Sequence, residues 1–198
     1  MTGVKQTPLH ETHVGLGARM VELGGWSMPI YYASQLEEHH AVREHAGLFD
    51  VSHMTVVDVV GVDAERYLRG LLANDVRKLR STADGQCRAL YSCMLRDDGG
   101  ILDDLIVYRL SDCEFRLVVN AATREKDLAW LLEQAGSHSV ELLELLELLE
   151  LLEQPNLAMI AVQGPHAREL VAQTLPHGDD LLALAPFSAR RDGENLVT

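Results

Sequence analysis

Hydrophobic and polar residues alternate along several short stretches of the chain, and this pattern predicts β-strands. Two of these stretches, residues 88–95 and 101–110, flank Asp97-Asp98-Gly99-Gly100, a sequence typical of a turn, so a β-hairpin is the simplest prediction. Runs rich in β-branched and apolar residues predict further strands over residues 54–60, 115–119 and 157–162.

Capping residues and helical periodicity predict helices between these strands. Ser34 and Glu37 form a capping box and Gly47 suits the position after a helix end, which predicts a helix over residues 35–46. Asp63 and Asn120 can each cap a helix, and Pro165 can begin one. The helix after Asp63 is expected to carry Tyr67, Leu68, Leu71 and Leu72 on one stripe. The helix after Asn120 is expected to carry Leu128, Leu131 and Leu132 before a stop at Gly136. The helix that Pro165 begins is expected to end near Leu175. Strands and helices mixed with hairpins predict an α+β fold.

One segment fits neither the helical nor the strand period. From Glu141 to Glu153 the chain repeats Glu-Leu-Leu, and a three-residue period drifts about 60° per repeat around an α-helix, so the glutamates spiral around it. Our hypothesis is an expanded repeat that lies in a surface connection as an irregular helix. The alternative is a leucine seam that binds a partner, although a coiled coil needs a 3.5-residue period over several heptads.

Composition and charge indicate the general type of protein and exclude some classes of partner. The chain has 198 residues, enough to bury a sizeable core, and its 47% hydrophobic and 24% charged residues are typical of an ordinary globular protein. The formal net charge of −13 argues against nucleic acid and against an anionic membrane surface as partners. The sequence has no apolar run of transmembrane length and no targeting segment after Met1, so the expected location is the cytoplasm.

The cysteines and histidines do not predict a metal centre. Cys87, Cys93 and Cys113 are odd in number and lack zinc-type spacing, which favours reduced structural thiols. The histidines at positions 10, 13, 39, 40 and 45 match no metal-binding motif.

Two adjacent acids, Asp103 and Asp104, interrupt an otherwise apolar strand. Successive side chains of a strand point to opposite faces, so Leu102, Asp104 and Tyr108 are expected on one face and Asp103 on the other. From the residues alone, both acids can be turn or edge residues, because aspartate is common near glycine-rich turns. The alternative is that one of them lies at the mouth of an apolar pocket beside a tyrosine.

A series of motifs, taken in order, resembles a known family. The motifs are Thr7-Pro8-Leu9-His10, Gly25-Trp26-Ser27-Met28-Pro29, Asp50-Val51-Ser52-His53-Met54, Leu71-Leu72-Ala73-Asn74-Asp75, the Asp103-Asp104 strand, Val118-Val119-Asn120-Ala121-Ala122, Glu125-Lys126-Asp127 and Ala161-Val162-Gln163-Gly164-Pro165. In this order and at these spacings the chain resembles the T-protein of the glycine cleavage system, the tetrahydrofolate-dependent aminomethyltransferase, from about Gln6 to Leu175. The resemblance implies the folate-binding fold of that family, an α+β fold with ferredoxin-like elements and antiparallel strands.

The resemblance also implies a site and a reaction. Asp104 matches the main catalytic residue of the family, and Met54, Tyr91, Tyr108 and Asn120 match residues of its folate pocket. Tetrahydrofolate would be the co-substrate, with no metal, and the lipoylated H-protein would be the partner. The methylene of its aminomethyl-lipoyl arm would pass to tetrahydrofolate with release of ammonia.

The residues by themselves leave other interpretations of this site open. Without the resemblance, Met54 and Tyr91 would be interpreted as core residues and Asn120 as a helix cap. We interpret Asp103 as structural.

The family continues beyond the region of resemblance, whereas this sequence stops at Thr198. We therefore expect residues 1–198 to be part of the folate-binding domain, truncated at the C-terminus and without the family's C-terminal barrel. Marginal stability, association and weak folate affinity are expected to follow. The alternatives are a non-catalytic folate-binding remnant and a folate-dependent iron–sulfur cluster assembly factor, whose Lys-Gly-Cys-Tyr-type motif does not occur here.

Overall fold

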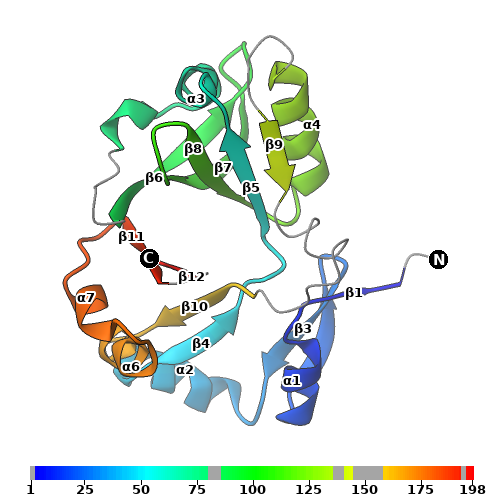
Figure 1. The fold of residues 1–198 in the computed structure, drawn as a ribbon. Coiled ribbons are helices and arrows are strands. Elements are labelled where there is room, and N and C mark those ends of the chain that lie inside the picture. The colour runs from blue at the N-terminus through cyan, green and yellow to red at the C-terminus, as the bar shows by residue number, and fades with distance from the viewer. Residues whose placement is uncertain (1–2, 80–85, 136–140, 145–157, 193–194) are drawn as a thin grey trace. The chain divides into compact units, whose positions relative to one another are not determined.

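The computed structural model describes residues 3–79, 86–135, 141–144, 158–192 and 195–198. These residues form two compact units. Figure 1 draws their helices and strands, coloured by residue number. Unit 1 contains the described residues of the segments 1–53 and 153–182, and unit 2 contains those of the segments 54–152 and 183–198. Each unit therefore combines two segments that are distant in the sequence. None of the helices in the described ranges is long and apolar enough to cross a membrane.

Unit 1 contains two small sheets and short helices. Its first sheet has the order β1 (Lys5–Gln6), β3 (Trp26–Tyr31), β2 (Arg19–Leu23), and its second pairs β4 (Gly47–Asp50) antiparallel with β10 (Ile160–Gln163). The helices are α1 (His10–Gly15), α2 (Gln35–Glu44), α6 (Ala167–Thr174) and α7 (Gly178–Leu182). The buried His13 lies 3.0 Å from Asp50 Oδ2, and Thr7 Oγ1 donates to the same oxygen at 2.6 Å, so polar contacts join α1 to β4.

Unit 2 is built on an antiparallel seven-stranded sheet. The order of its strands is β12 (Asn195–Val197), β11 (Ser188–Asp192), β6 (Gln86–Leu95), β7 (Ile101–Arg109), β8 (Glu114–Val119), β5 (Thr55–Val60), β9 (Glu141–Glu144). The connections contain α3 (Ala64–Leu71), a 3₁₀ turn at Val76–Lys78 and α4 (Arg124–Ala135). The predicted hairpin is confirmed as β6 and β7, and the predicted strands over 54–60 and 115–119 are confirmed as β5 and β8.

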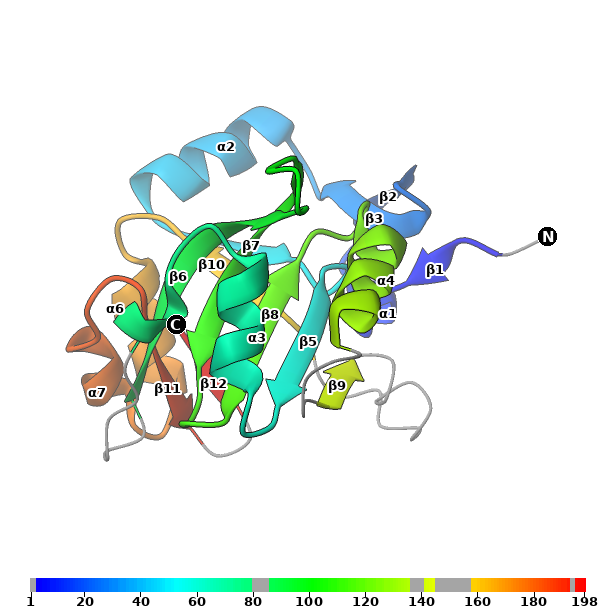
Figure 2. The same ribbon diagram turned by 90° about the horizontal axis from the view of Figure 1, so that it is seen from above.

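Helices α3 and α4 cover one face of this sheet (Figure 2). The strands contribute alternate residues to the core beneath them, and Tyr67 and Leu68 of α3 and Leu131 of α4 pack against these residues. Buried strand residues of this core are Val57, Val59, Leu105, Val107, Phe115, Leu117 and Val119. Tyr67 also donates a hydrogen bond of 2.6 Å to the carbonyl of Leu131, which joins the two helices.

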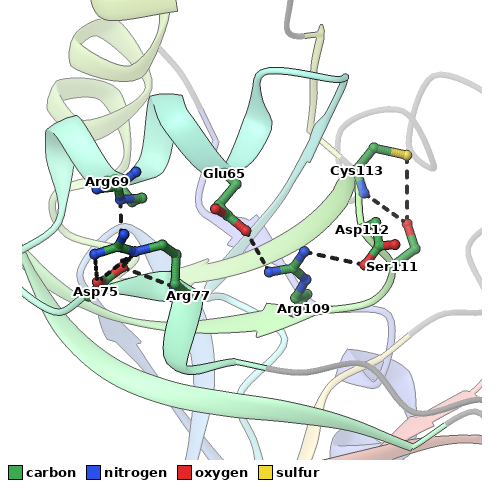
Figure 3. A network of polar contacts seen from close by, with 8 residues as sticks. All are labelled: Glu65, Arg69, Asp75, Arg77, Arg109, Ser111, Asp112 and Cys113. Carbon is green, nitrogen blue, oxygen red and sulfur yellow. Dashed lines mark hydrogen bonds and ion pairs between the residues drawn. The ribbon is translucent and has the colours of Figure 1, made fainter.

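Ion pairs join α3 to the sheet at one end of this core (Figure 3). Arg109 of β7 donates to Glu65 of α3 at 2.7 Å and to Asp112 in the following turn at 3.3 Å. Its guanidinium also lies 5.3 Å from the ring centre of Phe115. A second group in the same view joins Asp75 to Arg77 and Arg69.

Several predictions about individual elements are corrected by the structure. The irregular helix predicted for the Glu-Leu-Leu repeat is wrong at Glu141–Glu144, which forms β9 and pairs antiparallel with β5; the rest of the repeat lies outside the described residues. Backbone pairing with an edge strand outweighs side-chain periodicity in this segment. Helix α4 contains the three predicted apolar residues Leu128, Leu131 and Leu132, of which Leu131 is buried and Leu132 is 63% exposed. Asp63 precedes α3 but makes no capping side-chain bond to it.

The two remaining predicted helices and the last predicted strand are present with shifted ends. The helix predicted over 35–46 is α2, with Ser34 as its N-cap, and the helix predicted from Pro165 is α6. The strand predicted over 157–162 is β10, and its predicted first residue lies outside the described ranges, as does the predicted stop at 136.

Candidate functional site

The predicted site residues lie on the face of the unit 2 sheet that α3 and α4 do not cover. Strand register shows this, because residues that are paired across neighbouring strands point to the same face. Asp104 pairs with Cys93, Tyr91 pairs with Ile106, and Ile106 pairs with Val118. We call this surface the site face and define it by the predicted residues Met54, Tyr91, Asp104, Tyr108 and Asn120.

Asp104 and Asn120 are in direct contact at one end of the site face. Asn120 follows β8 immediately, and its Nδ2 donates to Asp104 Oδ1 at 2.9 Å and to the Asp104 carbonyl at 3.1 Å. Met54 directly precedes Thr55, the first residue of β5, and Thr55 pairs with Val119, the residue before Asn120. Asp104 and Asn120 are thus in contact, and Met54 adjoins the same end of the sheet in sequence.

The two tyrosines lie farther along the same face. Tyr91 is half exposed, and its register partner is Ile106, two residues from Asp104. Tyr108 is buried and is four residues from Asp104 on β7, which corresponds to about 13 Å along a strand. Its hydroxyl lies 3.5 Å from Thr198 Oγ1, and burial raises its pKa. The structure places Tyr108 on the predicted face but not in contact with Asp104.

The predicted sharing of faces along β7 is correct for Asp104 and Tyr108 and wrong for Leu102. Leu102 packs against the core under α3 and α4, together with residues such as Leu105. The cause is an irregularity in the hairpin, because Met94 pairs with Asp103 whereas the next residue, Leu95, pairs with Ile101. One extra residue in a strand interrupts the alternation at that point.

Asn120 also binds the other acid, so it does not serve as the helix cap that was one of the two interpretations. Its Nδ2 lies 3.0 Å from Asp103 Oδ1 and its backbone nitrogen lies 3.2 Å from Asp103 Oδ2. Thr123 Oγ1 donates to the same Oδ2 at 2.9 Å. Helix α4 begins only at Arg124. Asp103 is only 7% exposed, and its structural role stays a prediction.

The electrostatics of Asp103 follow from these contacts. Burial raises the pKa of its carboxyl, but the hydrogen bonds from Asn120, Asp127 and Thr123 outweigh burial and hold the pKa below the usual range. Asp103 is therefore ionised, and its negative charge is in contact with the Asn120 side chain. The amide of Asn120 has its orientation set by this charge, since only its NH₂ end can donate to both carboxylates.

Sequence reasoning missed an ion pair on the site face. Arg116 is the register partner of Tyr108, and it donates from Nε to Asp58 Oδ1 at 2.7 Å and from Nη2 to Asp58 Oδ2 at 2.8 Å. Asp58 is 6% exposed. The signal in the sequence was an acid in the middle of the β-branched run of β5, where a buried strand should not carry an unpaired charge.

Comparison of the chain with known protein families identifies one that matches it. The family model described as the GCVT N-terminal domain matches residues 9–195. The chain belongs to this family. The predicted resemblance to the glycine cleavage T-protein is thereby confirmed.

Relatives within the GCVT N-terminal domain family show how far the likeness extends. The chain is 56% identical over 167 residues to a protein of Stenotrophomonas maltophilia named aminomethyltransferase, covering 84% of this chain and 42% of that protein. It is 48% identical over 194 residues to an aminomethyltransferase of Alcanivorax borkumensis, covering 97% of this chain and 50% of that protein. The chain thus spans about half the length of the curated relatives it matches.

A solved member of the family confirms the fold. The crystal structure of the glycine cleavage system aminomethyltransferase T from Bartonella henselae matches with a TM-score of 0.82 and 34% sequence identity. The match covers 97% of this chain and 48% of that chain. The predicted α+β fold of the T-protein is therefore correct.

Proposed function

We propose that the site face of this chain binds the pterin ring of tetrahydrofolate and that Asp104 is the acid–base group of an aminomethyl transfer. The observation that carries the proposal is the Asp104–Asn120 contact at the end of the sheet. A general base needs a fixed position within hydrogen-bond reach of the proton it accepts. Asn120 provides that fixed position, because it is itself bound to the buried Asp103.

The oxygens of Asp104 differ in a way that suits this role. Oδ1 accepts from Asn120 Nδ2, whereas Oδ2 makes no hydrogen bond with any residue that the structure describes. Asp104 is only partly buried. One oxygen can thus hold the carboxylate in place while the other receives a donor group or a proton from a ligand.

The remaining residues of the site face suit a flat heteroaromatic ring. Met54 and Tyr91 supply apolar surface near Asp104, and the Asn120 amide and Asp104 carboxylate supply a few polar groups, which is the usual composition of a small-molecule site. Tetrahydrofolate would bring the amine that attacks the aminomethyl carbon. The residues of this chain would orient that amine and take up its proton at Asp104.

The donor and the cellular setting are also part of the proposal. Relatives named aminomethyltransferase and a structure titled as part of the glycine cleavage system support it. We propose that the lipoylated H-protein presents the aminomethyl group, that its methylene passes to tetrahydrofolate, and that ammonia and the reduced lipoyl carrier are released. The setting that we propose is the cytoplasm.

Calorimetric titration with a stable reduced folate tests the proposal. The Asp104→Asn variant removes the charge with little change in shape, and we expect it to bind about tenfold or more weakly, because a hydrogen bond to a charged group contributes about 1.5–3 kcal/mol. Asp112→Asn is the matched control, since it neutralises a carboxylate that is 94% exposed and lies outside the site face. Equal affinities in all three folded proteins, or no binding by any of them, would overturn the proposal.

An assay of ammonia release from aminomethyl-lipoyl H-protein then separates binding from transfer. Release that depends on both reduced folate and Asp104 is expected for the transferase. Folate binding without release would instead identify a folate-binding module, the alternative to catalysis.

A further inference from the structure

Asp127 is a buried acid that the proposed function leaves unexplained. It lies in the first turn of α4 and is 0% exposed. Neither of its carboxylate oxygens meets a hydrogen-bond donor in the described part of the chain. A buried carboxylate without donors is costly, so such a group normally neutralises itself by holding a proton.

The neighbour of Asp127 is Asp103, the acid that anchors Asn120. The two carboxyl groups act on one another: Asp127 lowers the pKa of Asp103, and Asp103 raises the pKa of Asp127. Two carboxylates are both acceptors, so a hydrogen bond can form between them only if one member of the pair holds a proton. Asp103 already accepts from the backbone and side chain of Asn120 and from Thr123. Asn120 donates to Asp103 and not to Asp127, so Asp127 is the member of the pair that favours the proton.

The charges around the pair favour the same assignment. Burial is the largest cause that raises the pKa of Asp127, to about 7, and the negative charge of Asp103 raises it further. Thr123 and, to a smaller extent, Lys126 oppose these effects, but Thr123 Oγ1 is also bound to Asp103 Oδ2 and Lys126 Nζ to the carbonyl of Leu102 on β7. The titratable groups that face Asp127 are thus Asp103 from the sheet and Lys126 from its own helix.

We propose that Asp127 is a positioning residue that donates a proton-bearing hydrogen bond to Asp103 and thereby fixes Asn120 and Asp104. The functional half of this inference rests on the proposed function, whereas the shared proton does not. The chain of contacts runs from Asp127 to Asp103, from Asp103 to Asn120 Nδ2 at 3.0 Å, and from Asn120 Nδ2 to Asp104 Oδ1 at 2.9 Å. When Asp127 loses its proton, two buried carboxylates repel each other and the anchor of Asn120 loosens.

Infrared difference spectroscopy tests the shared proton without any ligand. The wild-type chain is expected to show the carbonyl stretch of a protonated carboxylic acid at about pH 6, and this band should disappear as the pH rises above about 7. Asp127→Asn should lack the band, whereas Asp112→Asn should keep it. A spectrum without the band in the wild type, or with an unchanged band in Asp127→Asn, would overturn the proposal.

The pH dependence of unfolding supplies a second readout. An acid whose pKa is raised in the folded state stabilises the fold below its unfolded pKa and loses that contribution as the pH rises to the folded value. Asparagine at position 127 donates to Asp103 at every pH. The folding constant of Asp127→Asn relative to the wild type should therefore grow by up to about tenfold per pH unit between about pH 4 and about pH 7, and then stay constant. A ratio that does not change with pH would contradict the assignment.

Folate affinity tests the positioning role itself. Wild-type affinity for a stable reduced folate should fall as the pH rises through about 7, whereas Asp127→Asn should keep its affinity. Asp127→Leu fills the site without a donor and should bind weakly at every pH. Equal affinity in Asp127→Leu and Asp127→Asn, with both folded, would overturn the positioning role. If no variant binds folate, the proposed function fails, and the infrared and unfolding results still decide whether the proton is shared.

Discussion

At the scale of single residues, Asn120 determines how the two adjacent acids differ. Its amide contacts both Asp103 and Asp104, although a strand should send these side chains to opposite faces. This is possible because Asn120 follows the last residue of β8, where the sheet ends and one side chain can reach both faces. Asp103 becomes a buried anchor and Asp104 remains accessible.

Replacing Asn120 should therefore have two separable effects. Asn120→Ala removes a donor from the buried Asp103, and we expect a loss of about 1–3 kcal/mol in the free energy of unfolding, measured by urea denaturation. Asn120→Asp keeps the shape but adds a third carboxylate, so it should be less stable than Asn120→Ala near neutral pH. Greater stability of Asn120→Asp would contradict the anchoring role that the contacts indicate.

Sequence patterns predicted part of this residue-level arrangement. Alternation placed Asp104 and Tyr108 on one face of the strand and Asp103 on the other, which is the arrangement in the structure. The position of Leu102 could not be predicted, because a register irregularity depends on how the partner strand pairs. The burial of Asp127 was not predicted, although Asp127 precedes the buried Leu131 by one helical turn and therefore lies on the same helix face.

At the scale of elements, strand β9 is a case in which the periodicity of the sequence does not predict the secondary structure. The Glu-Leu-Leu repeat matches neither a helix nor a strand, yet Glu141–Glu144 pairs along β5 from Val60 to Val57. The free edge of β5 decides this pairing, and its location depends on the order of strands rather than on the repeat. The hairpin of β6 and β7 was predictable because its turn and both strands are contiguous in sequence.

The repeat allows a direct test at this scale. Deleting nine residues, 145–153, leaves a single Glu-Leu-Leu-Glu segment that can still pair with β5. We expect the free energy of unfolding to change by less than about 1 kcal/mol and the amides of β5 to keep their protection in hydrogen exchange. Loss of cooperative unfolding in the shortened chain would show that the extra repeats are needed for folding.

At the scale of the whole molecule, each unit combines distant segments of the chain. Residues after 153 complete unit 1, and residues after 183 add β11 and β12 to the sheet of unit 2. Periodicity along the chain could not predict these long-range pairings, whereas the family resemblance did predict the fold that contains them. All of the predicted site residues belong to unit 2, so the central claim concerns one sheet face alone.

Mapping of backbone amide shifts on addition of a stable reduced folate tests that claim most directly. The account predicts that the largest shifts occur at Met54, Asp104 and Asn120, with small shifts in α3 on the opposite face of the sheet. The Asp104→Asn variant should need a higher folate concentration to reach the same shifts. Shifts centred on α3, or no shifts in the folded protein at a saturating folate concentration, would contradict the account.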